Sequence, residues 1–160
     1  MIKRSCALLL ALFYGVASAG QLTDQVDRFE QKRELKWVSS IRGGDSAQMG
    51  TNASVVFSKD NVALNGIVQL AASFESLRYS RCNSARWLVD GTPMVPLSTE
   101  YQAYPRKDSS RSVEIVTSIF TAPQLREIGR ANLVEYKVCN DEGKVAEEDL
   151  AGLRELTDRL

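Results

Sequence analysis

The residue types that most often carry catalysis are scarce in this chain. Histidine does not occur among its 160 residues, which excludes imidazole bases, Ser-His-Asp and Cys-His triads and the common zinc sites. The sequence also contains no G-x-S-x-G, P-loop, G-x-G-x-x-G or S-x-x-K motif. Glycoside hydrolysis needs two carboxylates that face each other across a cleft, and no spacing selects a pair from Asp90, Glu100 and Glu114. We therefore predict a protein that is not an enzyme and binds no cofactor, and we keep a carboxylate hydrolase as a third hypothesis.

A cluster of acidic residues near the C-terminus could in principle hold calcium, because hard cations prefer oxygen ligands. Five carboxylates lie close together in the sequence: Asp141, Glu142, Glu147, Glu148 and Asp149. The EF-hand spacing is missing, and a turn followed by the acidic first turn of a helix accounts for the same residues. We predict no metal site.

The two cysteines of the mature chain predict a structural disulfide. Cys82 and Cys139 lie beyond an N-terminal leader that contains the third cysteine, Cys6. In an oxidising compartment such a pair reads as a bridge, and the C-x-x-C spacing of a redox pair is absent. The bridge would close 139 − 82 = 57 residues and contribute about 4 kcal/mol in the chain-entropy model. Both cysteines share a strand face with polar residues, so we expect the bridge on an outer face or at a sheet end, between neighbouring strands.

Residues 1–19 have the three parts of a signal peptide. Lys3 and Arg4 form a positive region, an apolar stretch too short to span a bilayer follows, and an A-x-A sequence ends at Ala19. No later run reaches the roughly 20 apolar residues of a transmembrane helix. We therefore predict a single mature domain, residues 20–160, in the bacterial periplasm or secreted, with no transmembrane segment.

The charge balance disfavours polyanionic partners. The full chain has 20 basic and 20 acidic residues, and removal of the leader's two basic residues leaves 18 − 20 = −2. A nearly neutral domain lacks the electrostatic footprint of a protein that binds nucleic acid or an anionic membrane. We expect neither partner.

The C-terminal part of the chain has the clearest pattern, which predicts strand, helix, strand and helix. Residues 112–120 alternate as a strand does. A capping box that starts at Thr121 then begins a short helix near 122–130. A second strand follows at 133–139, and a helix with a leucine stripe is expected near 147–159.

The earlier segments add strands and turns. Residues 20–33 read as a short amphipathic helix or an arm laid on the domain. Asn65-Gly66 and Asp90-Gly91 are hairpin signals, and the strand at 92–98 contains two prolines, which places it at a sheet edge. Together these elements predict an α+β fold with an antiparallel sheet of about six or seven strands, curled or sandwich-like, and the two helices packed on it.

The polar segment 99–111 reads as a loop and holds the candidate interaction residues Tyr101, Tyr104 and Arg106. Tyrosine and arginine are common in interface hot spots, and loops on a rigid scaffold often carry function. The alternative is a solvated connector whose tyrosines cover a sheet edge.

These observations favour a non-catalytic periplasmic or secreted interaction module. Such an accessory or inhibitor-like protein would bind another periplasmic or envelope protein through a loop or a sheet edge. The alternative is a carrier of a small apolar or lipid ligand, enclosed between the curved sheet and its helices.

Overall fold

The computed structural model describes residues 20–39, 49–82, 84–106 and 110–160. The predicted signal peptide lies outside the described residues. Within them the chain forms ten strands and two helices in this order: β1 (Gln21–Asp27), β2 (Lys32–Val38), β3 (Gly50–Phe57), β4 (Ala63–Phe74), β5 (Ala85–Val89), β6 (Thr92–Met94), β7 (Ser98–Pro105), β8 (Ser112–Thr121), α1 (Ala122–Arg130), β9 (Val134–Val138), β10 (Asp141–Lys144) and α2 (Glu147–Thr157). The predicted α+β class is confirmed, and both helices lie where the sequence placed them.

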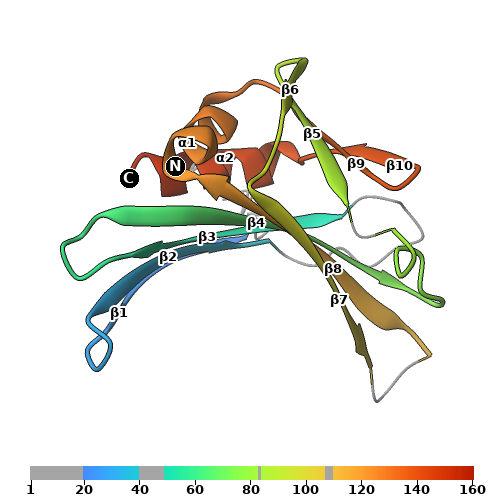
Figure 1. The fold of residues 1–160 in the computed structure, drawn as a ribbon, viewed down its shortest axis with the longest axis horizontal. Helices are drawn as coiled ribbons and strands as arrows, with labels where there is room; N and C mark the ends of the chain where they lie inside the picture. The colour runs from blue at the N-terminus through green and yellow to red at the C-terminus, as the bar shows by residue number, and fades with distance from the viewer. Residues whose placement is uncertain (1–19, 40–48, 83, 107–109) are drawn as a thin grey trace, which may run out of the picture.

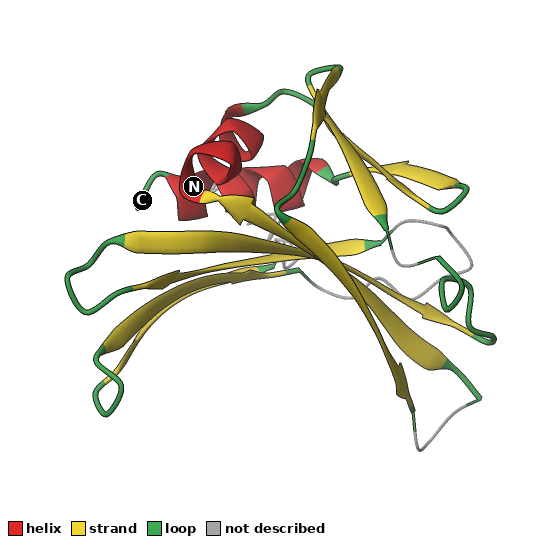
Figure 2. Ribbon diagram, viewed as in Figure 1, coloured by secondary structure: helices red, strands yellow, loops and turns green. Residues whose placement is uncertain are grey.

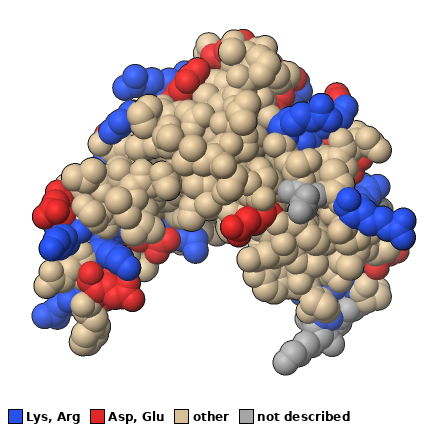
Figure 3. Space-filling view, in the orientation of Figure 1, with Lys and Arg blue, Asp and Glu red and all other residues tan. Residues whose placement is uncertain are grey.

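The strands form two antiparallel sheets. The larger sheet has the order β1-β2-β3-β4-β8-β7, and the smaller has the order β10-β9-β5-β6. The six-stranded sheet is curved, and α1, α2 and the four-stranded sheet all lie over one of its faces (Figures 1 and 2). The opposite face is not covered by any described element, and the space-filling view shows it hollowed between two lobes (Figure 3).

The core lies between the six-stranded sheet and the layer above it. Val68 and Val116 of the six-stranded sheet are fully buried there. The Trp87 indole of β5 reaches across from the smaller sheet, donating a 3.0 Å hydrogen bond to the Ser118 hydroxyl and packing edge-on against Phe120 at 5.7 Å. Each fully buried apolar side chain contributes about 1.5–3 kcal/mol. These contacts hold the two sheets together as one packed unit.

The capping box of α1 forms as the sequence predicts. The Thr121 hydroxyl accepts a 3.3 Å hydrogen bond from the Gln124 amide, and the Gln124 side-chain oxygen accepts one of 3.0 Å from the Thr121 amide. Two N–H groups that the helix start would otherwise leave unpaired are thus satisfied.

The predicted hairpin at Asn65-Gly66 is wrong, because β4 runs straight through this dipeptide. The chain reverses earlier, at Asn61, which has a φ of 56°. Gly66 lies under α1, where an added Cβ would come within 2.5 Å of the Leu125 Cδ2 atom. The glycine therefore allows a helix to approach the sheet closely and does not mark a turn.

The C-terminal helix α2 covers the other half of the same sheet face. Its leucines Leu150, Leu153 and Leu156 are buried, as the predicted stripe requires. Gly152 lies directly on the Trp37 ring, and a Cβ at this position would overlap it. No helix in the described part of the chain is long and apolar enough to cross a membrane.

The N-terminal segment is a strand and not the helix or arm predicted from its spacing. It forms β1, which pairs with β2 through its whole length. Leu22 lies opposite Trp37 and packs on the core, whereas Phe29, which completes the apparent helical spacing, lies in the turn and is fully exposed. Because Leu22 is the one apolar side chain of β1 that packs on the core, the sequence of β1 shows little of the apolar–polar alternation that is typical of a strand.

Candidate functional site

The segment predicted as an interaction loop is an edge strand. Ser98–Pro105 form β7, which pairs with β8 along its whole length and is the last strand of the six-stranded sheet. The loop prediction was therefore wrong for most of residues 99–111. The composition is polar, but alternate side chains face inward and are half-buried: Thr99, Tyr101 and Ala103.

The three candidate residues do not form one patch. Tyr101 points inward, where its hydroxyl donates a 2.8 Å hydrogen bond to Glu114. Tyr104 lies on the outer face, 52% exposed, and its hydroxyl donates to the Gln102 side chain at 2.6 Å. Arg106 follows the strand, and its amide donates to the carbonyl of Arg111. Tyr101 is thus an anchor of the strand, and Tyr104 is the exposed one of the two tyrosines.

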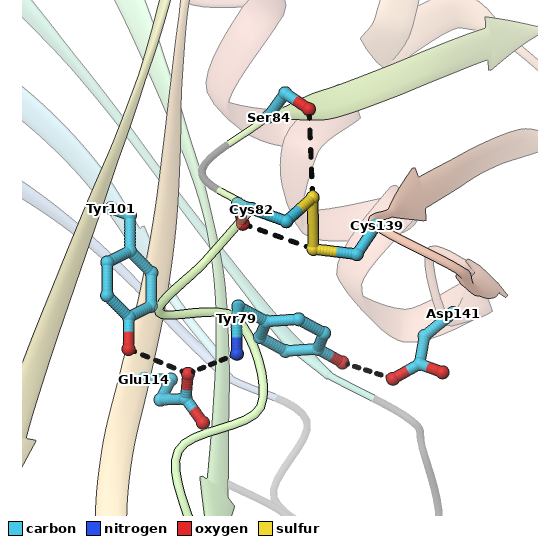
Figure 4. The surroundings of a disulfide bond; sticks show 7 residues. All are labelled: Tyr79, Cys82, Ser84, Tyr101, Glu114, Cys139 and Asp141. Carbon is cyan, nitrogen blue, oxygen red and sulfur yellow. Dashed lines mark hydrogen bonds between the residues drawn. A yellow bond between two sulfur atoms is a disulfide. The ribbon is translucent and has the colours of Figure 1, made fainter.

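Glu114 of β8 joins three segments of the chain (Figure 4). Its carboxylate is fully buried, and one oxygen accepts the Arg78 amide at 2.7 Å. The other oxygen accepts the Tyr79 amide at 2.9 Å and the Tyr101 hydroxyl at 2.8 Å. Burial, the hydrogen bond to Glu114 and the charge of Glu114 raise the pKa of Tyr101 to about 12. A buried carboxylate is tolerated here because hydrogen-bond donors surround it.

The predicted disulfide between Cys82 and Cys139 is confirmed, with 5.7 Å between the two Cα atoms. It lies at one end of the four-stranded sheet, next to the paired residues Ala85 and Val138. Cys139 has a φ of 56°, so the chain reverses there and continues directly as β10. The sequence analysis assigned the acidic residues Asp141 and Glu142 to a turn, whereas the structure places both in β10. The bridge leaves no thiol in the described part of the chain.

A second anchored tyrosine stabilises the loop between β4 and β5. The Tyr79 hydroxyl donates a 2.8 Å hydrogen bond to Asp141, which also pairs with Arg78 at 3.4 Å (Figure 4). Burial is the largest cause of a raised pKa for Tyr79, followed by the hydrogen bond and the charge of Asp141. Tyr79 and Tyr101 therefore keep their protons near neutral pH and act as hydrogen-bond donors, not as bases or nucleophiles.

The three carboxylates considered for hydrolysis do not converge. Glu114 faces the core, whereas Glu100 projects from the opposite, outer face of the same sheet. Asp90 accepts the amides of Asn132 and Leu133 at 3.0 and 2.9 Å and so caps the start of β9. Within the described ranges, no group of three or more potential metal ligands occurs.

On the side of β7 that faces away from β8, the main-chain groups have no pairing strand among the described residues. The hydrogen bond from the Arg106 amide to the Arg111 carbonyl continues the β7–β8 ladder, and it sets which residues of β7 point toward β8. The even-numbered residues of β7 bond to β8. Thr99, Tyr101 and Ala103 therefore turn their N–H and C=O groups away from β8, toward the open edge.

The other sheet edges are protected in ways that β7 is not. Edge strands are commonly blunted by charge, proline or short length. The edge strand β1 carries Asp24 and Asp27, β6 has three residues with Pro93 in the middle, and β10 has four residues. β7 has eight residues, one charged side chain, Glu100, and a proline only at its end. It is the longest and least protected edge in the part of the chain that the structure describes.

Sequence reasoning assigned the segment of β7 to the wrong element, a loop, and it gave Glu114 no structural role. The one available signal is a glutamate within an alternating, largely apolar strand, which predicts a buried carboxylate with nearby donors. The donors come from segments up to 36 residues away, so spacing alone could not identify them. Comparison with protein-family models, with curated proteins and with solved structures finds no match for this chain.

Proposed function

We propose that this protein is a non-catalytic interaction module, accessory or inhibitor-like in character, that binds an extended segment of a partner protein. The partner strand would add to β7 and continue the six-stranded sheet. The observation that carries the proposal is the open, eight-residue edge of β7. At Thr99, Tyr101 and Ala103 the main-chain N–H and C=O groups point away from β8, toward this edge.

Strand addition draws its affinity from main-chain hydrogen bonds and its specificity from alternate side chains. Each main-chain hydrogen bond contributes about 0.5–1.5 kcal/mol net. Tyr104 and Gln102 lie on the outer face beside the edge and would contact side chains of the partner. The pairing with β8 and the Tyr101–Glu114 hydrogen bond hold β7 in its extended shape before binding, which lowers the entropic cost of association.

We place this interaction in the periplasm or outside the cell. The predicted leader indicates export. The Cys82–Cys139 disulfide is compatible with an oxidising compartment. A partner in the same compartment, such as another envelope protein, would meet the β7 edge directly.

Site-specific photo-crosslinking tests the proposal. A photoreactive residue at position 102 projects from the outer face of β7, and in the native host it is expected to give one adduct of defined mass with a single partner. The same residue at Glu127, which is exposed on α1, serves as the matched position and is expected to give none. Equal labelling at both positions would argue against a specific edge contact.

A pair of variants at one position tests the binding mode. Ala103→Pro removes an N–H that points toward the open edge of β7. The hydrogen bonds between β7 and β8 should stay intact, since proline is tolerated at such an edge position. Ala103→Ser keeps the N–H. The proline variant should lower the yield of adduct about tenfold, the loss expected when about 1.4 kcal/mol of hydrogen bonding disappears, and the serine variant should not. If Ala103→Pro is unfolded by circular dichroism, Thr99→Pro makes the same test; undiminished adduct in a folded proline variant refutes strand addition.

A further inference from the structure

The outer face of the four-stranded sheet contains an open groove of about 590 Å³. Its volume lies within the range of about 300–1,000 Å³ that is usual for small-molecule sites. It lies on a different sheet from β7, so a ligand there does not compete for the β7 edge.

One part of the groove is apolar and exposed. Leu88 is 38% exposed and Val95 is 77% exposed, and Pro93 and Pro96 line the groove beside them. Leu88 and Pro93 are directly paired across β5 and β6. Covering such surface with an apolar body would gain about 25 cal/mol per Å² removed from water.

The floor of the groove offers few main-chain hydrogen bonds. β5 lies between β9 and β6, and β9 lies between β10 and β5, so the main chains of both strands are already paired on each side. A bound peptide would carry a polar group at every residue and leave these groups without partners on the floor. A ligand with its polar group confined to one end suits this surface better.

The groove also holds charged side chains, among them two neighbouring cations and, opposite Leu88, the carboxylate of Glu135. Arg86 and Lys137 are direct cross-strand neighbours, and like charges in this arrangement are unfavourable. Lys137 bonds to Glu142 at 2.5 Å, and the pKa of Glu142 is lowered, first by this bond and also by the nearby charge of Arg86. Within the described residues, the Arg86 guanidinium has no hydrogen-bond or ion-pair partner.

The remaining charges do not cancel this excess. Lys144 and Glu135 also line the groove and are paired in register across β9 and β10. Counting the five lining charges gives three cations and two carboxylates, a net of +1. In the space-filling view, basic side chains lie beside a surface without charged residues at the upper right, over the four-stranded sheet (Figure 3).

We propose that this groove binds an aliphatic carboxylate of the fatty-acid class. The carboxylate would bond to Arg86, whose planar guanidinium matches two carboxylate oxygens, and the alkyl chain would lie over Leu88 and Val95. The anion would also relieve the repulsion between Arg86 and Lys137. This ligand site does not depend on strand addition at β7. It lies on the four-stranded sheet and not between the curved sheet and its helices, where the sequence-based expectation had placed an apolar ligand.

Calorimetric titration of the mature protein tests the proposal with two ligands of equal chain length and opposite charge. Decanoate, below its micellar concentration, should bind with one-to-one stoichiometry. Decyltrimethylammonium should bind at least about tenfold more weakly, because its charge is repelled where the carboxylate is held. Absence of decanoate binding, or equal binding of the two amphiphiles, overturns the proposal.

Variants then locate the site. Arg86→Gln should weaken decanoate binding about tenfold, while Arg28→Gln, at an exposed arginine in the β1–β2 turn, should leave it unchanged. Leu88→Glu should abolish binding. Equal affinities for wild type and Arg86→Gln refute the assignment, as does tighter binding of acetyl-Leu-Leu-Leu carrying a free carboxylate than of decanoate. Crosslinking from position 102 should be the same in Arg86→Gln as in the wild type, which separates the two proposals.

Discussion

Replacing Tyr101 with phenylalanine removes one hydroxyl group and leaves the shape of β7 unchanged. In the wild type this hydroxyl donates a 2.8 Å hydrogen bond to the buried carboxylate of Glu114. Tyr104 lies three residues further along the same strand, and its hydroxyl donates a hydrogen bond to the side chain of the exposed residue Gln102. Tyr104→Phe is therefore a matched control, since it deletes the same group from the other face.

The two substitutions are expected to lower the free energy of unfolding by different amounts. A hydrogen bond to a charged group contributes about 1.5–3 kcal/mol, and the half-buried position of Tyr101 places the expected loss at the lower end, about 1.5 kcal/mol. For a domain of this size, a loss of about 1.5 kcal/mol in the free energy of unfolding lowers the melting temperature by about 5 °C. Tyr104→Phe should cost less than about 0.5 kcal/mol, as is usual for exposed sites.

Urea and thermal unfolding, followed by the fluorescence of the two tryptophans, measure both losses. Equal destabilisation by Tyr101→Phe and Tyr104→Phe would refute the role given to the Tyr101–Glu114 bond. A further check is the double variant with Glu114→Gln. Its loss should be clearly smaller than the sum of the two single losses, because each substitution by itself removes the charge-assisted hydrogen bond between Tyr101 and Glu114.

Comparison of the wild type with Tyr101→Phe also predicts how the free energy of unfolding depends on pH. The pKa of Tyr101 is raised from 10.0 to about 12 on folding, so the folded state binds this proton more tightly than the unfolded state does. The stabilisation is complete below pH 10 and is lost as the pH rises from about 10 to 12. The stability gap between the wild type and Tyr101→Phe should therefore be constant up to about pH 10 and narrow above it; a gap that widens there would contradict the reasoning.

Three further variants test the scaffold by the same unfolding measurements. Thr121→Ala removes the capping box of α1 and should cost about 1 kcal/mol; an unchanged urea midpoint would show that the cap contributes nothing. Gly152→Ala should destabilise by about 1–3 kcal/mol, because the added methyl group overlaps the Trp37 ring, although alanine is the better helix former by about 1 kcal/mol. A net gain in stability would mean that α2 can move away from the sheet. Replacing Cys82 and Cys139 together by serine should cost about 2–4 kcal/mol, and a loss below about 1 kcal/mol would show that the bridge is not a main source of stability.

The C-terminal elements could be predicted because the residues that determine them are close together in the sequence. The capping box at Thr121 and the leucine stripe of α2 each lie within a few residues of the element that they specify. The turn at Asp90-Gly91 is equally local, and the positive φ angles of both residues confirm it. The disulfide was predictable for a different reason, since the predicted mature chain contains only two cysteines.

The candidate site could not be predicted in the same way because β7 is specified by distant residues. Its composition is that of a loop, and its strand conformation depends on pairing with β8 and on the bond between Tyr101 and Glu114, 13 residues apart. The groove is still harder to predict from the sequence, because it joins the β5–β6 hairpin to the β9–β10 hairpin, and β7, β8 and α1 lie between these hairpins in the chain. Gly66 shows a related ambiguity, since a glycine required by the approach of Leu125 has the same sequence signature as a turn.

The strands of the two sheets alternate along the chain, and this has a consequence for folding during synthesis. In the chain, β5, β6 and β7 lie between β4 and its neighbour β8. In the smaller sheet, β5 pairs with β9, which comes after β8 and α1 in the chain. A chain that emerges from its N-terminus therefore presents the bare edge of β4 until residues 112–121 have followed. The last segment to emerge, α2, covers Trp37 near the beginning. The larger sheet begins with β1 at Gln21 and the smaller sheet ends with β10 at Lys144, so both sheets are complete only when the chain has been made as far as Lys144.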